Sequence, residues 1–310
     1  MSPASTARRN QITGVVYAGS AYLIWGFLPL YFLLLAPTSP GEVVAWRVLF
    51  SLLVCAVLLT VMRGWQPFVA ILRHPKLLGL TALAGALIYI NWLVFLFAAL
   101  EGHIVEVSLG YFINPITTVL LGVFVLKERI RKLQWAAIAI AAIAVVVIVV
   151  ALGTFPWIAL SLTATFGLYG LIKKQIGPAV DAVSGLTLES AWLTPIAVVQ
   201  LTIVALTSGL TIGTAGFVHT LLLCLVGVAT AFPLLLFASG TRRIGLATVG
   251  MIQFVTPVLQ FIVGVALLHE PMPPERWIGF VIVWIAILVF VVDLLLAARR
   301  GWRTSHAELV

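Results

Sequence analysis

The strongest constraint on this chain is a long stretch that occurs twice. Val107–Trp135 reads VSLGYFINPITTVLLGVFVLKERIRKLQW, and Val249–Trp277, in the second half of the chain, reads VGMIQFVTPVLQFIVGVALLHEPMPPERW. Eight positions coincide without a gap: Val107/Val249, Phe112/Phe254, Pro115/Pro257, Gly122/Gly264, Val123/Val265, Leu126/Leu268, Glu128/Glu270 and Trp135/Trp277. The two residues of every pair are separated by the same number of positions, and we call this separation the repeat offset. The repetition predicts that the protein consists of two copies of one structural unit.

Apolar runs of roughly 20 residues recur along the whole chain, the length at which a helix crosses a hydrocarbon core of about 30 Å. Only 9% of the residues are charged, whereas a soluble protein carries about a quarter. We therefore predict an all-α polytopic membrane protein with ten transmembrane helices. The ten spans cover approximately residues 12–35, 41–62, 77–100, 104–126, 134–151, 155–172, 183–207, 218–239, 244–268 and 277–298.

The distribution of Lys and Arg predicts the orientation of these spans. With a cytoplasmic N-terminus, 16 of the 18 basic residues fall in cytoplasmic segments, as the positive-inside bias requires. They are Arg8, Arg9, Arg63, Arg73, Lys76, Lys127, Arg129, Arg131, Lys132, Lys173, Lys174, Arg242, Arg243, Arg299, Arg300 and Arg303. The net charge of +8 is then explained by topology, with no nucleic-acid partner needed, and both termini are expected in the cytoplasm.

Each predicted copy holds five spans, residues 1–151 in the first copy and 152–310 in the second. Because five is odd, the second copy enters the membrane upside down. Inverted five-helix repeats are a recurrent architecture of secondary transporters, in which the substrate site lies near the midplane between the copies.

Polar residues interrupt spans 4 and 9 at matching positions. Span 4 carries Tyr111, Asn114, Pro115, Thr118 and Gly122, and span 9 carries Gln253, Thr256, Pro257, Gln260 and Gly264. Each set lies on one helix face, and each proline frees the carbonyl one turn earlier and favours a kink. Polar side chains are costly in hydrocarbon, so we expect these stripes to bind substrate in a cavity. Close helix packing through Gly122 and Gly264 is the alternative.

Aromatic and amide side chains add candidate substrate contacts on spans 1 and 3. Trp25 in span 1 and Trp92 in span 3 lie deeper than the aromatic belt at the membrane interface. Tyr89 and Asn91 accompany Trp92. We expect these four residues to line a pathway, and core packing is the alternative.

Two ionisable residues fall within spans at equivalent positions. Arg47 lies in span 2 and Glu189 in span 7, separated by the same repeat offset. An intramembrane charge suggests function: Glu189 could bind protons or a cationic group, and Arg47 could attract an anion. Alternatively, both side chains extend to the interface or pair with a loop residue such as Glu42.

Several features are expected to be structural or absent. Glu128 and Glu270 follow the ends of equivalent spans and are interpreted as turns or caps, and Glu106 as a complement to a helix N-terminus. The sequence contains no phosphate-binding loop, no metal-ligand pattern and no nucleophile–base pair. We therefore expect no enzyme activity, no cofactor, no metal and no ATPase partner.

Local motifs resemble a known transporter family over essentially the whole chain. They are AYLIWGFLPLYF (21–32), AWRVLFSLL (45–53), NWLVFLFA (91–98), EVSLGYFINP (106–115), LKERIRKLQW (126–135) and FGLYGLIKK (166–174). Together they are similar to the EamA branch of the drug/metabolite transporter superfamily, and within it to the RarD, or chloramphenicol-sensitive protein, subfamily. The resemblance implies an inner-membrane permease whose central cavity is lined by spans 1, 3, 4, 6, 8 and 9.

These observations predict a secondary transporter that moves a small organic metabolite or drug-like solute across the cytoplasmic membrane by alternating access. Amino acids and their derivatives are the leading substrate class, because aromatic walls and uncharged amides suit an amphipathic solute. The partners expected are the substrate and the lipid bilayer, and one chain can form a complete pathway. The alternative is a membrane sensor or assembly partner that transports nothing.

Overall fold

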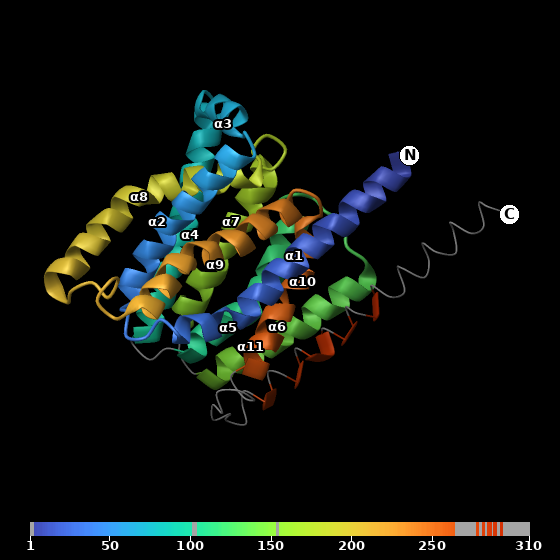
Figure 1. Ribbon diagram of the computed structural model, residues 1–310. Coiled ribbons are helices and arrows are strands. Elements are labelled where there is room, and N and C mark those ends of the chain that lie inside the picture. Colours follow the sequence, from blue (N-terminus) through green and yellow to red (C-terminus); the bar gives the residue numbers. More distant parts are fainter. Residues whose placement is uncertain are drawn as a thin grey trace.

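The computed structural model describes residues 3–100, 104–152, 155–263 and, beyond these, 277–278, 281–282, 284–286, 288–289 and 292–293. Every regular element that it describes is a helix (Figure 1). The helices are α1 (Pro3–Leu33), α2 (Pro40–Val61), α3 (Trp65–Leu72), α4 (Pro75–Leu100), α5 (Ile104–Phe124), α6 (Lys132–Leu152), α7 (Trp157–Ile176), α8 (Ala182–Thr207), α9 (Phe217–Thr241), α10 (Leu246–Gln253) and α11 (Val255–Ile262). Predicted spans 1 to 9 correspond to α1, α2, α4, α5, α6, α7, α8, α9 and the pair α10–α11.

The surface of the bundle is apolar. Large hydrophobic side chains such as Val57 on α2, Ile143 on α6 and Val199 on α8 are more than half exposed, whereas soluble monomers rarely expose wide apolar patches. Among the described residues, five helices are long and apolar enough to cross a bilayer, and three shorter apolar helices accompany them. The protein is therefore a multi-pass integral membrane protein.

Two helices begin with matching polar caps. The Ser39 hydroxyl accepts from the Glu42 amide at 3.3 Å and starts α2. The Asp181 carboxylate accepts from the Val183 and Ser184 amides, each at 3.0 Å, and starts α8. Such side chains satisfy amides that have no partner within the helix. The repeat offset also separates Ser39 from Asp181.

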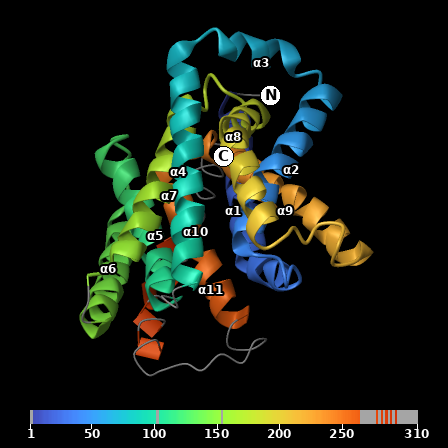
Figure 2. The same cartoon turned by 90° about the vertical axis from the view of Figure 1, so that its left-hand side faces the viewer.

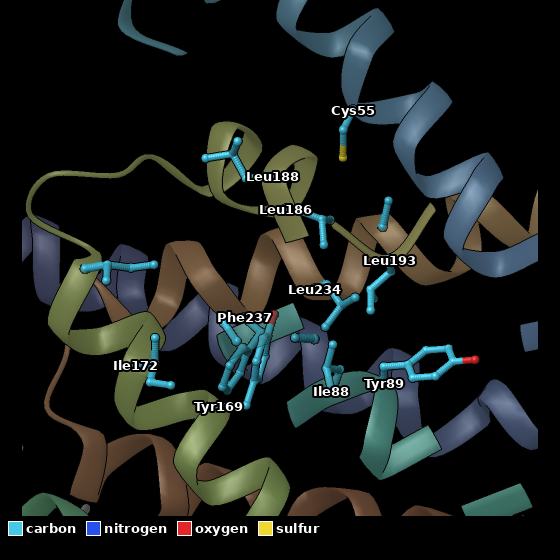
Figure 3. Packing of buried hydrophobic residues seen from close by; sticks show 14 of the residues in the cluster. Cys55, Ile88, Tyr89, Tyr169, Ile172, Leu186, Leu188, Leu193, Leu234 and Phe237 are labelled. Carbon is cyan, nitrogen blue, oxygen red and sulfur yellow. The ribbon is translucent and has the colours of Figure 1, made fainter. Parts of the chain in front are cut away.

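The helices pack mainly against partners that are distant in sequence. Helix α1 lies against α9, α10 and α11, α2 lies against α8 and α9, α4 lies against α7 and α8, and α5 lies against α7 and α10. The largest buried cluster includes Tyr22, Tyr169 and Phe237 from three of these helices. Figure 3 shows the Tyr169 and Phe237 rings side by side, and they stack with centroids 5.9 Å apart.

Span 9 is divided at one residue, Phe254, whose backbone stays in the helical region (φ −59°, ψ −17°), whereas α5 is continuous. Helix α10 ends at Gln253, Phe254 forms a turn, and α11 starts at Val255. Pro257 lacks the amide that would bond the Gln253 carbonyl, so one helical hydrogen bond is missing at this point. Helix α5 continues through Pro115 from Ile104 to Phe124.

Helix α3 was not expected from the apolar runs. It is a short helix between α2 and α4 at one end of the bundle (Figure 2), with Ile71 buried and Trp65, Val69 and Leu72 exposed. We name this end, with the loops at 62–64, 125–131, 177–181 and 242–245, the α3 end. The opposite end, with the loops at 34–39 and 208–216, is named the far end.

Candidate functional site

Arg47 lies among groups from four other helices, toward the far end of the bundle. Its Nε donates to the Thr230 hydroxyl on α9 at 3.1 Å. Its guanidinium carbon lies 4.2 Å from the ring centroid of Trp92 on α4 and 5.2 Å from that of Phe32 on α1. Tyr111 on α5 lies within electrostatic range. The site thus gathers three residues that the sequence singled out in separate spans, Arg47, Trp92 and Tyr111.

Glu42 is not the partner of Arg47. Its carboxylate is fully buried and accepts from the Thr211 amide at 2.9 Å, the Thr211 hydroxyl at 3.0 Å and the Trp46 indole at 3.2 Å. Glu42 therefore fixes the far-end loop to α2. The alternative that Arg47 pairs with Glu42 is wrong in this structure, and the described residues include no ion pair to Arg47.

Trp25 belongs to an aromatic cluster at the centre of the bundle. Its ring centroid lies 5.3 Å from Tyr22, 5.7 Å from Phe166 and 5.7 Å from Phe237. The ring is half-buried and joins α1 to α7 and α9. The contacts with Tyr22 and Phe166 are edge-to-face and stabilise beyond simple burial, so Trp25 combines a packing role with an accessible aromatic surface.

Tyr89 and Asn91 connect α4 to the second half of the chain. The Asn91 Nδ2 donates to the Leu162 carbonyl and to the Thr165 hydroxyl, both at 2.9 Å. The Tyr89 hydroxyl donates to the Gln200 Oε1 at 3.0 Å. Both side chains therefore hold helices together through the polar atoms that were expected to meet substrate.

The polar stripes of spans 4 and 9 meet at the crossing of α5 and α10. The Thr118 hydroxyl donates to the Gln253 Oε1 at 3.1 Å, and the Thr256 hydroxyl donates to the Tyr22 carbonyl at 2.9 Å. Asn114 is 5% exposed, and its Oδ1 has no partner among the described residues. Gln260 is half-buried on α11.

Close packing accompanies this polar contact, as the alternative interpretation of Gly122 required. A Cβ added to Gly122 would lie 2.7 Å from the Ala247 amide nitrogen, a distance that only glycine allows. The two prolines of the stripes, Pro115 and Pro257, are buried. Gly264 lies outside the described residues, so only one half of this expectation can be followed.

Glu189 lies near the α3 end, apart from the stripes. It is 1% exposed, and it pairs with Lys173 on α7 at 2.5 Å while accepting from the Tyr169 hydroxyl at 3.1 Å. Lys173 was expected in a cytoplasmic segment, but it lies in the last turn of α7 and is 4% exposed. Tyr169 and Lys173 are one helical turn apart, so this spacing could have indicated that they share a helix face.

Glu128 is a cap, as expected. Its two carboxylate oxygens accept from the amides of Leu246 at 2.7 Å and Ala247 at 2.8 Å. The loop that follows α5 thereby caps the N-terminus of α10. Glu270 and the side chain of Glu106 lie outside the described residues.

The described residues contain no cluster of three or more His, Cys, Asp or Glu side chains suited to a metal ion. Sequence reasoning also missed Asp293, whose carboxylate pairs with Arg131 at 2.5 Å. Nothing in the local sequence near Asp293 indicates a partner so distant along the chain.

Comparison with known proteins agrees with this architecture. Residues 12–150 match the EamA-like transporter family. The chain is 40% identical to "Protein RarD" of Streptomyces exfoliatus over 95% of this chain and 93% of that protein. It is 36% identical to "Protein RarD" of Escherichia coli strain K12, over 93% and 96% of the two chains.

Two further similarities concern function and fold. An "Uncharacterized transporter" of Vibrio cholerae is 38% identical over 95% of this chain and 94% of that protein. A solved crystal structure superposes with a TM-score of 0.66 at 17% identity, covering 89% of this chain and 96% of that chain. The latter shows that the fold is one observed before.

Proposed function

Because the chain belongs to the EamA-type drug/metabolite transporter superfamily and to its RarD subfamily, we propose that it is a secondary transporter of a small organic solute. Amino acids and their derivatives are the leading class. The solute crosses the cytoplasmic membrane by alternating access of two inverted halves. The family and the relatives named as transporters point away from an enzyme.

The observation that carries the proposal is the half-buried Arg47 among aromatic rings within an apolar bundle. A charge in a membrane interior is costly and marks a substrate or ion pathway by default. Aromatic faces with a few convergent polar groups are also the usual lining of a small-molecule site.

The helix contacts support the inverted repeat. The repeat offset pairs each helix of the first half with a counterpart in the second half: α1 with α7, α2 with α8, α4 with α9, and α5 with the pair α10–α11. If the halves are equivalent, exchanging the members of each pair should convert one helix contact into another contact that also occurs. This exchange converts the α5–α7 contact into α1–α11, the α1–α9 contact into α4–α7, and the α2–α9 contact into α4–α8. All six contacts occur, as two equivalent halves require.

Close helix approaches support the same equivalence. A Cβ on Gly85 of α4 would lie 3.2 Å from the Glu189 carbonyl oxygen on α8, and a Cβ on Gly227 of α9 would overlap the Phe50 backbone on α2. The repeat offset separates these two glycines as well.

The proposed orientation places the α3 end in the cytoplasm, because most Lys and Arg residues lie in the loops and helix ends on that side of the bundle. Cysteines introduced at Ala179 and Thr214, both exposed, test it. A membrane-impermeant maleimide should label Ala179→Cys only in inside-out vesicles and Thr214→Cys only in right-side-out vesicles. Equal labelling in both preparations contradicts the orientation.

The transport proposal is tested by an untargeted metabolite uptake and efflux screen, with purified protein in proteoliposomes for each hit. Trp25→Ala should lower the transport rate by roughly tenfold, because it removes a central aromatic surface. Trp157→Ala, at an exposed ring on α7, is the matched control and should transport normally. If no solute depends on the protein, the sensor or assembly alternative is favoured.

Proton coupling through Glu189 is a secondary proposal. Protonation of Glu189 would remove its ion pair with Lys173 and so couple a proton to the contact between α7 and α8. Glu189→Gln transport measured across an imposed pH gradient should lose its pH dependence. Unchanged pH dependence in this variant would exclude the coupling.

A further inference from the structure

The environment of Arg47 differs from that of its sequence counterpart in one informative way. Glu189, which lies one repeat offset later, is neutralised by Lys173. Helices α1 and α7 align with an offset shorter by one position, so the counterpart of Lys173 is Phe32, and Phe32 lies against Arg47. Glu189 therefore has a residue of opposite charge beside it, whereas Arg47 has an aromatic ring at the corresponding position.

The hydrogen-bond inventory of Arg47 is incomplete within the described residues. A guanidinium carries five N–H donors, and Nε donates to Thr230. The terminal Nη groups have no hydrogen-bond acceptor among the described residues, and the side chain is half-buried. A partly desolvated cation without a counter-ion is costly, so an anion that binds here gains both charge neutralisation and open donors.

Two aromatic rings and the Thr230 hydroxyl contact the guanidinium of Arg47. Trp92 lies 4.2 Å from the guanidinium carbon, close enough for a cation–π contact, and Phe32 lies at 5.2 Å. The Thr230 hydroxyl occupies the Nε edge of the guanidinium. The two Nη groups remain as a planar fork, which matches the two oxygens of a carboxylate.

We propose that the Nη fork of Arg47 is the docking subsite for the carboxylate of the transported solute, whose apolar part lies against Trp92 and Phe32. The proposal rests on the transport function proposed above and narrows its substrate class to amphipathic organic carboxylates, amino acids included. An inorganic anion would use the fork but not the aromatic walls, so it is expected to bind more weakly.

A direct test measures protection of Arg47 from phenylglyoxal, an arginine-specific reagent, in purified protein in nanodiscs. Phenylacetate, benzoate and L-phenylalanine are compared with their neutral amides, and with chloride and phosphate. At least one carboxylate should slow modification of Arg47 at concentrations roughly 30-fold below its amide, the ratio expected for a lost partner of a buried charge pair. Modification is read by peptide mass spectrometry.

Arg243 is the matched internal control. It also lies on a ring, 5.1 Å from the Tyr17 centroid, and its Nη1 donates to the Ser239 carbonyl at 2.7 Å. Carboxylates should leave its modification rate unchanged. Equal protection by amides, equal protection of Arg243, or protection by chloride or phosphate as strong as by the best carboxylate would each overturn the proposal.

Variants give an independent measurement. Arg47→Gln should remove the difference between carboxylate and amide in calorimetric binding, Arg47→Lys should retain part of it, and Arg243→Gln should retain all of it. If Arg47→Gln does not fold, Arg47→Lys and the wild-type protection experiment still decide the matter. A difference that persists in Arg47→Gln contradicts the proposal.

The two proposals can fail separately. Carboxylate protection at Arg47 without any solute movement in proteoliposomes would contradict transport while retaining the subsite. Transport of solutes that lack a carboxylate, with no carboxylate preference at Arg47, would retain transport and contradict the subsite.

Discussion

Arg47 and Glu189 are charged residues at corresponding positions of α2 and α8, but their surroundings differ in polarity. Glu189 is almost fully buried, with Lys173 at 2.5 Å and the Tyr169 hydroxyl at 3.1 Å. Arg47 is half-buried, and the groups around it are rings and the Thr230 hydroxyl. Glu189 thus has a counter-ion, Lys173, whereas the Nη donors of Arg47 have no acceptor among the described residues.

Because of this difference, substitution of the two charged residues should change the free energy of unfolding by different amounts. Removing one member of a buried ion pair leaves the other without compensation, which destabilises strongly. Removing Arg47, for which the described residues supply no counter-ion, removes its desolvation cost together with its cation–π contacts and its bond to Thr230. The same kind of substitution should therefore affect stability at one position and binding at the other.

The largest expected effect is at the pair. Lys173→Met should lower the free energy of unfolding by about 3–5 kcal/mol, because Glu189 is then a buried, unpaired carboxylate. Denaturant or thermal unfolding in detergent measures it. Lys174→Met is the control: Lys174 is half-buried and its Nζ donates to the neutral Ile244 carbonyl, so the loss should be clearly smaller.

The double variant Lys173→Met/Glu189→Met sharpens the result. Hydrophobic replacement of both partners of a buried pair is often neutral or stabilising, so the double variant should recover most of the loss. A double variant as unstable as Lys173→Met would mean that the ion pair is not the source of the effect.

Lys173 also marks the limit of what the sequence could predict. Apolar length located every described span, and the family motifs indicated the transporter superfamily. The sequence placed Lys173 in a cytoplasmic segment, but whether its side chain reaches the interface or turns inward depends on α8. Nothing in the sequence around Lys173 indicates that its partner is Glu189.

The same reason explains the other differences. Glu128 was identified as a cap from its repeated position, but the helix that it caps, α10, lies far away in sequence. Asn91 was recognised as an intramembrane amide, but its acceptor at Leu162 is set by the packing of α4 against α7. Residue type and depth can be predicted locally, whereas partners require the tertiary arrangement.

The next effect should follow from giving Arg47 a counter-ion, which the described part of the chain does not supply. Phe32→Glu places a carboxylate at the position corresponding to Lys173, and this internal anion should compete with the solute's carboxylate. Carboxylate binding should weaken by roughly 30-fold, the loss expected for one charge-pair partner, as measured by calorimetry. Phe32→Gln has a similar size and no charge, and it should weaken binding much less.

A third effect contrasts with Lys173→Met directly. Arg47→Met should change the free energy of unfolding by only about 1 kcal/mol or less, because lost cation–π contacts are offset by relief of a desolvated charge. The same unfolding assay measures both variants. A loss as large as that of Lys173→Met would show that Arg47 is a structural charge and would break the comparison.

The smallest effect compares the caps at the starts of the same two helices. Asp181→Ala removes two acceptor contacts of 3.0 Å from α8, whereas Ser39→Ala removes one of 3.3 Å from α2. Cap removal typically costs about 1 kcal/mol, so both variants should be destabilised, with Asp181→Ala worse by roughly 0.5 kcal/mol since its acceptor is charged. Unfolding of both in the same detergent decides it. Equal losses would contradict this prediction and would mean that the two caps contribute equally to stability. The two helices would then differ at Arg47 and Glu189 but not at their caps.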